Sequence, residues 1–337
     1  MKSIVYIVPY FGKLPNLFRL WLKSCEYNPT IDWLLYIDDR SVYDYPPNVK
    51  VHYISFDEMK KQIQDVFPFH IELSHPYRLC DYRVAYGRIF AKDIQRYDFW
   101  GFCDIDLIFG DIRFFLKDCI LETYDKIGYL GHSTLFRNIE RMNLLYEQSL
   151  GEEMLYKAIF TDASNQNHFF DERGINQLCE QYGIKIYKET IFADLTPLTW
   201  NFQINYASEL EFRKNNHRLF VWEEGKLYSY SLLRNNICKD EFMYVHFLRR
   251  RINIEKGLHS VDKFLIVPNR IIKLPMEITN QIIKKYSRNR MFFYWIDLFI
   301  AKWKKIGLRN LILYFHIRRK AMKVFNDNKL NNTGGHD

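Results

Sequence analysis

Two aspartates, Asp104 and Asp106, carry the strongest chemical signal in this sequence. They follow the apolar run DFWGFC and are separated by one residue in GFCDIDLIFGDI. In an extended strand, side chains two residues apart point to the same face, so the two carboxylates are expected side by side. Adjacent carboxylates repel each other unless a cation lies near them, and hard oxygen ligands suit Mg²⁺ or Mn²⁺. The pattern predicts a divalent metal site; the alternative is two solvated acids at a strand end.

His246 is the best remote candidate for a further metal ligand. It ends the apolar segment FMYVH and precedes Arg249, Arg250 and Arg251. A neutral imidazole suits Mn²⁺, and arginine guanidinium groups pair with phosphate oxygens. The alternative is a core histidine beside a solvated basic turn.

The elements that would position these residues alternate between strands and helices. Strands are expected over 3–8, 32–39, 49–56 and 98–106, and helices over 14–25, 57–67 and 81–97. This alternation implies an α/β domain with a largely parallel sheet, whose ligands gather at the carboxyl ends of the strands. Acids stand at such ends twice, at Asp38/Asp39 and at Asp104/Asp106.

The pattern is less regular after residue 111. We expect a strand and turn over 127–138, helices over 139–160 and 170–183, a strand over 185–192, and irregular, aromatic loops over 196–228.

Composition bounds the class of protein. The 337 residues are 48% hydrophobic and 17% aromatic, which is ample for a core and excludes a disordered chain. The six cysteines include no C-x-x-C pair, which excludes a zinc ribbon or a thioredoxin-type site. The first apolar run is short and contains Pro9, unlike a signal peptide, and no run approaches the length of a membrane span. These features predict a reduced, cytoplasmic protein.

The net charge of +8 belongs to one segment. Residues 281–325 hold 12 of the 48 Lys and Arg but only 1 of the 40 Asp and Glu. The rest of the chain is slightly acidic, which argues against a nucleic-acid partner. The segment mixes its basic residues with aromatics such as Trp295 and Trp303, a composition typical of helices that lie in a membrane interface. The alternative is a helical subdomain that packs on the catalytic domain.

Several blocks together resemble a known family. The strand and turn CDIDLIFGD, which follow DYRVAYGRIF, resemble the D-x-D region of GT-A-type nucleotide-sugar glycosyltransferases. With the opening IVPYFGKLPNLFRLWLKSCEYNPTIDWLLYIDD and the blocks RLCDYRVAYG, GHSTLFRN and YVHF, residues 1–250 resemble largely uncharacterised bacterial glycosyltransferases of surface-polysaccharide synthesis, for capsule or lipopolysaccharide.

The resemblance implies roles for the residues already singled out. In GT-A enzymes the D-x-D acids bind the metal and the sugar nucleotide, which implies Asp104 and Asp106. In lipopolysaccharide-type galactosyltransferases, the histidine of a late H-[YF] dipeptide is a third metal ligand. His246–Phe247 matches this dipeptide, although the Gly, Lys, Pro and Trp that follow it in those enzymes are absent here.

Four residues near the first two strands are candidates for binding the nucleotide. A GT-A fold holds the nucleobase and ribose at the end of its first strand, where this chain has Tyr10 and Phe11. Either ring would stack on a uracil, with core packing as the alternative. Asp38 or Asp39 would accept a hydrogen bond from the base or the ribose.

Five further residues complete the predicted site. Asp81 and Arg83 open a helix near the donor, and Arg83 would contact the diphosphate unless the two form a structural ion pair. FDERG resembles the acidic segment that faces the donor sugar or acceptor, so Asp171 and Glu172 would bind sugar hydroxyls or supply a general base. Acids are also favoured at a helix start by the dipole alone. His132 would line the same pocket.

Together these observations predict a GT-A-like (Rossmann-like) catalytic domain over 1–255, a helical, basic membrane-associating region over 256–325 and a disordered tail over 326–337. The expected function is metal-dependent transfer of a sugar, from a nucleotide-sugar such as a UDP-hexose, to a glycan or lipid-linked acceptor at the inner face of the membrane. The alternatives are a metal-dependent nucleotidyltransferase that acts on sugar phosphates and a non-catalytic adaptor at a membrane surface. The absence of a Gly-rich triphosphate-binding loop after the first strand disfavours the nucleotidyltransferase.

Overall fold

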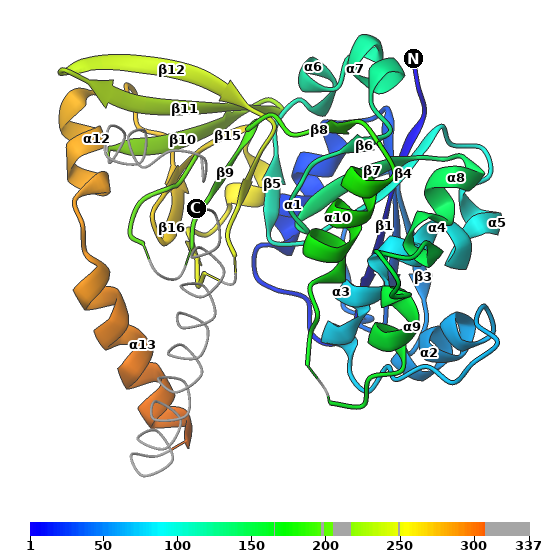
Figure 1. Cartoon of the computed structure of the whole chain (residues 1–337). Helices are drawn as coiled ribbons and strands as arrows, with labels where there is room; N and C mark the ends of the chain where they lie inside the picture. The colour runs from blue at the N-terminus through cyan, green and yellow to red at the C-terminus, as the bar shows by residue number, and fades with distance from the viewer. Residues whose placement is uncertain (165, 197–198, 205–216, 249, 307–337) are drawn as a thin grey trace, which may run out of the picture. The chain divides into compact units, whose positions relative to one another are not determined.

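A computed structural model describes residues 1–306 except 165, 197–198, 205–216 and 249 (Figure 1). The chain divides into two compact units, Met1–Ser287 and Arg288–Asp337. The first unit is a mixed α/β structure with a large sheet flanked by helices, as the strand–helix alternation predicted.

The large sheet has seven strands in the order β3-β2-β1-β4-β7-β6-β8. Its strands are β1 (Ile4–Tyr10), β2 (Ile31–Ile37), β3 (Val49–Tyr53), β4 (Phe99–Cys103), β6 (Lys126–Ile127), β7 (Ser133–Arg137) and β8 (Ile186–Tyr187). The first four strands in this order are parallel, and β7 is antiparallel to both β4 and β6. The carboxyl ends of β1, β2 and β4 therefore lie at the same edge of the sheet.

Alternation along β1 explains why helices cover both faces of this sheet. Val5 and Ile7 pack in one core cluster, whereas Ile4, Tyr6 and Val8 pack in another. The first cluster is covered by α2 (Phe56–Gln64), α3 (Leu79–Tyr82), α4 (Tyr86–Ile89), α5 (Ala91–Ile94), α8 (Glu140–Asn143), α9 (Leu155–Phe160) and α10 (Ile175–Gln181). The second is covered by α1 (Phe18–Glu26), α6 (Ile112–Phe115) and α7 (Asp118–Thr123).

Two further sheets complete the first unit. A three-stranded sheet has the order β5-β13-β9, with β5 (Leu107–Phe109), β13 (Tyr244–His246) and β9 (Phe192–Asp194). A six-stranded sheet has the order β12-β11-β10-β15-β16-β14, with β10 (Arg218–Glu223), β11 (Lys226–Leu233), β12 (Asn236–Phe242), β14 (Asn253–Ile254), β15 (Lys263–Val267) and β16 (Arg270–Lys273). The small sheet matters most for function because β5 follows β4 directly, through Asp104 and Asp106.

The elements predicted up to residue 67 are confirmed, whereas several later ones differ. The helix expected over 139–160 is divided into α8, a 3₁₀ turn (Leu145–Glu147) and α9. The helix expected over 81–97 is divided into α3, a 3₁₀ turn (Arg83–Ala85), α4 and α5. The region 196–228, expected to be irregular, contains β10 and the start of β11. Successive side chains of β10 from Arg218 to Trp222 are all buried, so this strand lacks the polar–apolar alternation that marks a half-buried strand.

The predicted domain boundary after residue 255 falls inside the first unit. Residues 256–287 form β15, β16 and α12 (Asn280–Ser287) rather than a separate helical region, and Ile283 of α12 is buried against β10 and β15. The second unit begins at Arg288 and contains α13 (Met291–Ile306). Residues 307–337, which include the predicted tail 326–337, lie outside the described residues, as does the side chain of Trp303.

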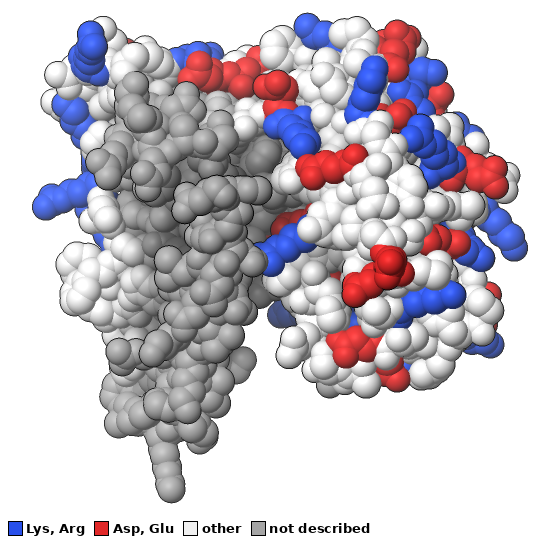
Figure 2. Space-filling model, viewed as in Figure 1, with Lys and Arg blue, Asp and Glu red and all other residues white. Residues whose placement is uncertain are grey.

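Surface charge on the first unit is mixed. Figure 2 shows Lys and Arg side chains interspersed with Asp and Glu over the helices α8 to α10 and their surroundings. On this face, basic and acidic side chains alternate instead of gathering in a patch of one sign. Within the described part of the chain, no helix has both the length and the apolar character needed to cross a bilayer.

Candidate metal centre

The two aspartates of the D-x-D motif lie in the bend between β4 and β5. β4 ends at Cys103 and β5 begins at Leu107, so Asp104 and Asp106 do not occupy the extended strand that the spacing predicted. Their carboxylates nevertheless converge on one imidazole. The Nε2 atom of His246 lies 3.7 Å from Asp104 Oδ2 and 3.5 Å from Asp106 Oδ1.

His246 reaches the aspartates because β13 is the central strand of the small sheet. β13 pairs antiparallel with β5, which places His246 opposite Leu107. The backbone N–H of Phe247 donates to the carbonyl of Asp106 at 3.0 Å, and this bond fixes the bend against the end of β13. Strand pairing thus returns His246, which lies 140 positions after Asp106, to the motif, and the predicted trio is brought together.

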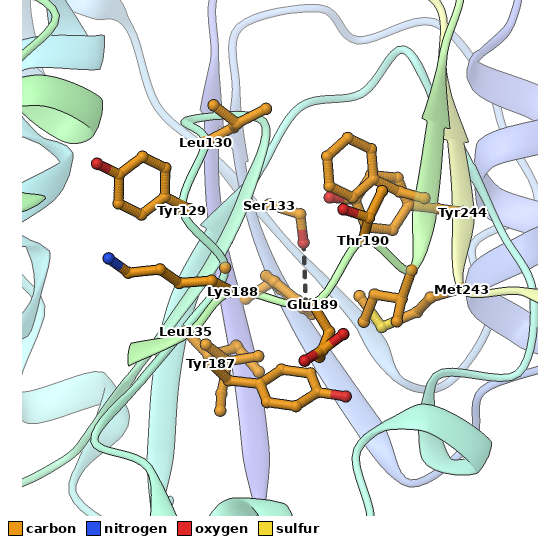
Figure 3. A pocket seen from close by; sticks show the side chains of 15 residues that line it. Tyr129, Leu130, Ser133, Leu135, Tyr187, Lys188, Glu189, Thr190, Met243 and Tyr244 are labelled. Carbon is orange, nitrogen blue, oxygen red and sulfur yellow. Dashed lines mark hydrogen bonds between the residues drawn. The ribbon is translucent and has the colours of Figure 1, made fainter. Parts of the chain in front are cut away.

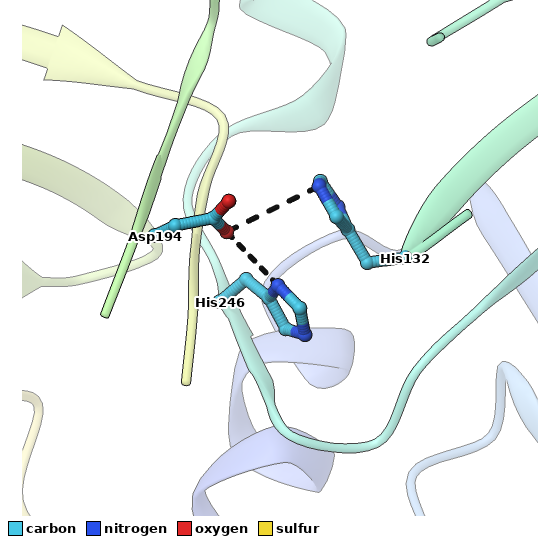
Figure 4. Close-up of side chains that lie close together, drawn as sticks. All are labelled: His132, Asp194 and His246. Carbon is cyan, nitrogen blue, oxygen red and sulfur yellow. Dashed lines mark hydrogen bonds and ion pairs between the residues drawn. The ribbon is translucent and has the colours of Figure 1, made fainter. Parts of the chain in front are cut away.

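Asp194, at the end of β9, holds the other side of the His246 ring (Figure 4). The two residues are opposite each other in parallel register, and the Nδ1 atom of His246 donates to Asp194 Oδ1 at 2.9 Å. This bond directs Nε2 toward Asp104 and Asp106, the arrangement in which an outer carboxylate orients a metal-binding histidine. Sequence reasoning missed Asp194, although an acid that ends the apolar run IFAD is the same signal that identified Asp104.

His132 lies against His246, with ring centroids 4.5 Å apart. Its Nδ1 atom shares a hydrogen bond with the hydroxyl of Tyr244 at 3.0 Å, and its Nε2 atom lies 4.0 Å from Asp194 Oδ1. Burial, with a smaller effect from His246, lowers the pKa of His132 to about 3. His132 is therefore neutral at physiological pH and forms a wall of the cluster.

Negative charge accumulates around His246. Burial alone would lower the pKa of its imidazole, but the carboxylates of Asp106 and Asp194 outweigh burial and raise this pKa to about 10. The Asp104 carboxylate lies on the same side of the ring as Asp106. A cluster that binds a proton this tightly is one that a cation would stabilise.

Arg83 connects the D-x-D motif to the acidic segment FDERG. Its guanidinium forms an ion pair with Asp104, donates to Asp171 Oδ2 at 3.0 Å and donates to the carbonyl of Gly131 at 2.7 Å. The pairing predicted as the alternative, Arg83 with Asp81, is absent from these contacts. Arg83 thus lies beside the cluster, as expected for a residue near the diphosphate.

Asp171 is buried in a π-helical turn, Phe170–Gly174, at the start of α10. Burial raises its pKa to about 7, even though the charge of Arg83 acts in the opposite direction. The carboxyl group therefore exchanges a proton near neutral pH, which is the range that general acid–base catalysis requires.

Glu172 fixes the loop that carries His132. Its Oε1 atom accepts a hydrogen bond from the backbone N–H of Gly131 at 2.9 Å. A Cβ atom on Gly131 would lie 2.7 Å from Asp171 Oδ2, so a larger residue here would displace the Asp171 carboxylate. In this conformation the Glu172 carboxylate is therefore already hydrogen-bonded to a backbone group of the protein.

Asp81 anchors the segment before Asp171 and lies apart from the D-x-D cluster. Its carboxylate is fully buried and accepts hydrogen bonds from the backbone N–H groups of His168 and Phe170, at 3.1 and 3.2 Å. Arg78 lies beside it at 3.7 Å. These contacts give Asp81 a positioning role for the acidic segment.

The four candidates for nucleotide binding, at the ends of β1 and β2, already form contacts within the protein. Asp38 and Asp39 each accept a hydrogen bond from a backbone N–H of the loop that follows β1, at 2.7 and 3.0 Å. The ring of Phe11 packs against Phe56 with centroids 5.4 Å apart. Tyr10 is half-buried, and burial together with the carboxylates of Asp106 and Asp39 raises its hydroxyl pKa. Of these four, Tyr10 is the one linked electrostatically to the D-x-D motif.

The described arginines that follow His246 lie in different surroundings. Arg250 is buried and donates to the carbonyl groups of Thr196 and Thr199, so it braces that loop. Arg251 is exposed, and Arg249 lies outside the described residues.

The ligand atoms of Asp104, Asp106 and His246 lie within 4.8 Å of one another. Two carboxylate oxygens and one imidazole nitrogen at this spacing fit a Mn²⁺ or Mg²⁺ ion. A second trio, His132, Asp194 and His246, meets the same distance criterion and is fully buried. In that trio, however, Nδ1 of His246 is already engaged by Asp194, so the first trio has the better-directed ligand atoms.

A protein family of unknown function, DUF6625, matches residues 6–275 of the chain. The chain belongs to this family. The match includes every residue of the cluster and ends before α12, so the site lies wholly within the family's common region. No curated relative matches the chain.

Proposed function

We propose that this protein is a metal-dependent glycosyltransferase with a GT-A-like catalytic unit. It would move a sugar from a nucleotide-sugar, such as a UDP-hexose, to a glycan or lipid-linked acceptor in the synthesis of a cell-surface polysaccharide. The observation that carries the proposal is the convergence of Asp104, Asp106 and His246 at the carboxyl end of β4, where ligands of parallel sheets gather.

The three residues would hold a Mn²⁺ or Mg²⁺ ion through Asp104, Asp106 and Nε2 of His246. A bound divalent ion stabilises the negative charge that develops on a departing diphosphate. Asp194 keeps the His246 ring in the orientation that binding requires. Arg83, which forms an ion pair with Asp104 in this structure, is suited to pair with a phosphate oxygen.

Asp171 is the strongest candidate for the base. In the reaction, the bond between the sugar carbon and the diphosphate oxygen breaks, and the acceptor hydroxyl oxygen forms the new glycosidic bond. The hydroxyl proton then needs an acceptor. The Asp171 carboxyl, with a pKa of about 7 and a position beside Arg83, is suited to receive it.

The second unit supports a membrane-associated acceptor. α13 exposes an apolar stripe made of Phe292, Phe293, Ile296, Phe299 and Ile300. These positions recur with the spacing of one helix face. Each Lys or Arg of the 281–325 segment that reaches an anionic surface would contribute about 1 kcal/mol. This composition supports binding at the inner face of the cell membrane.

Calorimetry of UDP and UDP-sugars with and without Mn²⁺ tests the proposal. Because the ion would contact both protein and diphosphate, each ligand must raise the affinity of the other by the same factor. Asp104→Asn should abolish this coupling, whereas Asp57→Asn, an exposed control on α2, should not. If the full-length protein bound UDP and UDP-sugars with the same affinity in the presence and absence of Mn²⁺, the proposal of a metal-dependent transferase would be refuted.

Product analysis separates the remaining candidates. Release of pyrophosphate from a nucleoside triphosphate and a sugar phosphate would favour the nucleotidyltransferase. Cell-surface polysaccharide synthesis that is unaffected by Asp104→Asn would favour the non-catalytic adaptor.

A further inference from the structure

A cavity of about 320 Å³ lies where the small sheet meets the seven-stranded sheet (Figure 3). One wall consists of Tyr6 on β1 with Ser133 and Leu135 on β7, and the opposite wall includes Met243 and Tyr244. These side chains are all buried, so the floor of the cavity belongs to the interior of the first unit. The cavity falls at the lower end of the volumes that small-molecule sites occupy.

The lining suits an apolar ligand. The hydroxyl of Tyr6 is paired with Ser133 Oγ at 3.3 Å, and the hydroxyl of Tyr244 is paired with His132. The polar groups of the floor are thus engaged with each other, and aromatic and aliphatic surfaces dominate the rest. The lining also includes Ile127, Leu130, Tyr187, Thr190, Ile191 and Phe192.

Charged and exposed residues are confined to the mouth of the cavity. Tyr129, Lys188 and Glu189 are exposed, and the ammonium group of Lys188 lies 4.7 Å from the centre of the Tyr129 ring. A ligand with a hydrocarbon end and a polar end would place the first on the floor and the second at this mouth.

The cavity and the metal centre are built on the same two strands. Phe192 and Tyr244 are opposite each other in the register of β9 and β13, and Asp194 and His246 form the pair two residues further along. Two residues of strand span about 7 Å. His132 contacts both Tyr244 and His246, so one aromatic layer separates the cavity from the cluster.

We propose that this cavity binds a hydrocarbon group of the acceptor, of the isoprenoid type, while the polar part of the acceptor leaves through the mouth beside Lys188. That the ligand is the acceptor rests on the proposed function, whereas its apolar character rests on the lining of the cavity. The volume corresponds to on the order of ten water-sized groups, so a chain of about two isoprene units would fill it.

A chain-length series of isoprenyl phosphates tests this assignment on the full-length protein. Dimethylallyl, geranyl and farnesyl phosphate, each below its micelle concentration, are titrated by calorimetry, with inorganic phosphate as the headgroup control. Affinity should rise on the order of tenfold or more from the five-carbon to the ten-carbon chain, because more apolar surface leaves water. It should then change little once the cavity is filled.

Thr190→Trp places a large ring in the cavity from a loop position, and Thr161→Trp places the same ring on an exposed site near α9. The first variant should lose geranyl phosphate affinity on the order of tenfold, and the second should retain it. Both should keep the circular dichroism spectrum of the unchanged protein.

Each other outcome overturns part of the proposal. If no isoprenyl phosphate binds, or if binding survives in Thr190→Trp because the chain lies on α13, the cavity is not the hydrocarbon site. If the cavity binds geranyl phosphate as predicted but UDP and Mn²⁺ do not bind in the same samples, the transfer reaction is refuted. In that case the ligand is not an acceptor.

Discussion

Asp171→Asn should stabilise the folded protein while it removes activity. Asn has nearly the shape of the protonated carboxyl group but cannot ionise. The pKa of Asp171 is raised from 3.8 to about 7 by burial, and a shift of this size corresponds to about 4 kcal/mol between the charged and neutral forms. Asp171 therefore lowers the free energy of unfolding at neutral pH, as functional groups held in unfavourable surroundings often do.

The sign of the pH dependence follows from which state binds the proton. Between pH 4 and pH 7 the folded protein holds the Asp171 proton and the unfolded chain does not, so this group's contribution to stability is present below about pH 4. It is lost as the pH rises through 7. The gain in Asp171→Asn should therefore grow from about 1.5 kcal/mol at pH 5 to about 4 kcal/mol above pH 7.

Urea denaturation of the two proteins at pH 5, 6, 7 and 8 measures this difference. Asp125→Asn is the matched control, because Asp125 is also paired with an arginine, Arg137, at 2.6 Å but is partly exposed. It should lose up to about 1 kcal/mol at every pH. If Asp171→Asn were destabilised at pH 8, the ion pair with Arg83 would outweigh burial and the reasoning would be refuted. Full transferase activity in this variant would exclude Asp171 as the base.

Three further outcomes are expected. Asp194→Asn removes the charge that faces Nδ1 of His246, so Mn²⁺ affinity should fall about 10- to 100-fold by calorimetry; an unchanged affinity would exclude a supporting role for Asp194. Asp106→Asn removes a ligand and should abolish the Mn²⁺ dependence of UDP binding, with Asp57→Asn as control; persistent dependence would move the metal elsewhere. A chain that ends at Ser287 keeps the whole first unit and should bind UDP with Mn²⁺ but not anionic vesicles in co-sedimentation, whereas retained vesicle binding would assign the membrane surface to the first unit.

The sequence by itself determined the local features of the catalytic unit. The β-branched and aromatic runs predicted β1 to β4, and the first-turn acids of DEMKKQIQ predicted α2, because strand and helix periodicities are properties of neighbouring residues. The same local reasoning selected Asp104 and Asp106, since they stand one residue apart directly after a buried apolar run and before a Gly-Asp turn. It also separated the basic segment 281–325 from the rest of the chain.

His246 was a candidate ligand from the sequence, but only the tertiary structure brought it to the motif and added Asp194. His246 and Asp194 lie far from Asp104 in sequence and reach it through the pairing of β13 with β5 and β9, whose register no local pattern specifies. The unfavourable setting of Asp171 is likewise invisible in FDERG, because its pKa depends on burial under α3 and on Arg83. Periodicity acts over a few residues, whereas strand register and burial are set by the packing of the whole unit, so the contacts of His246 with the aspartates and the supporting carboxylate of Asp194 had to be read from the fold.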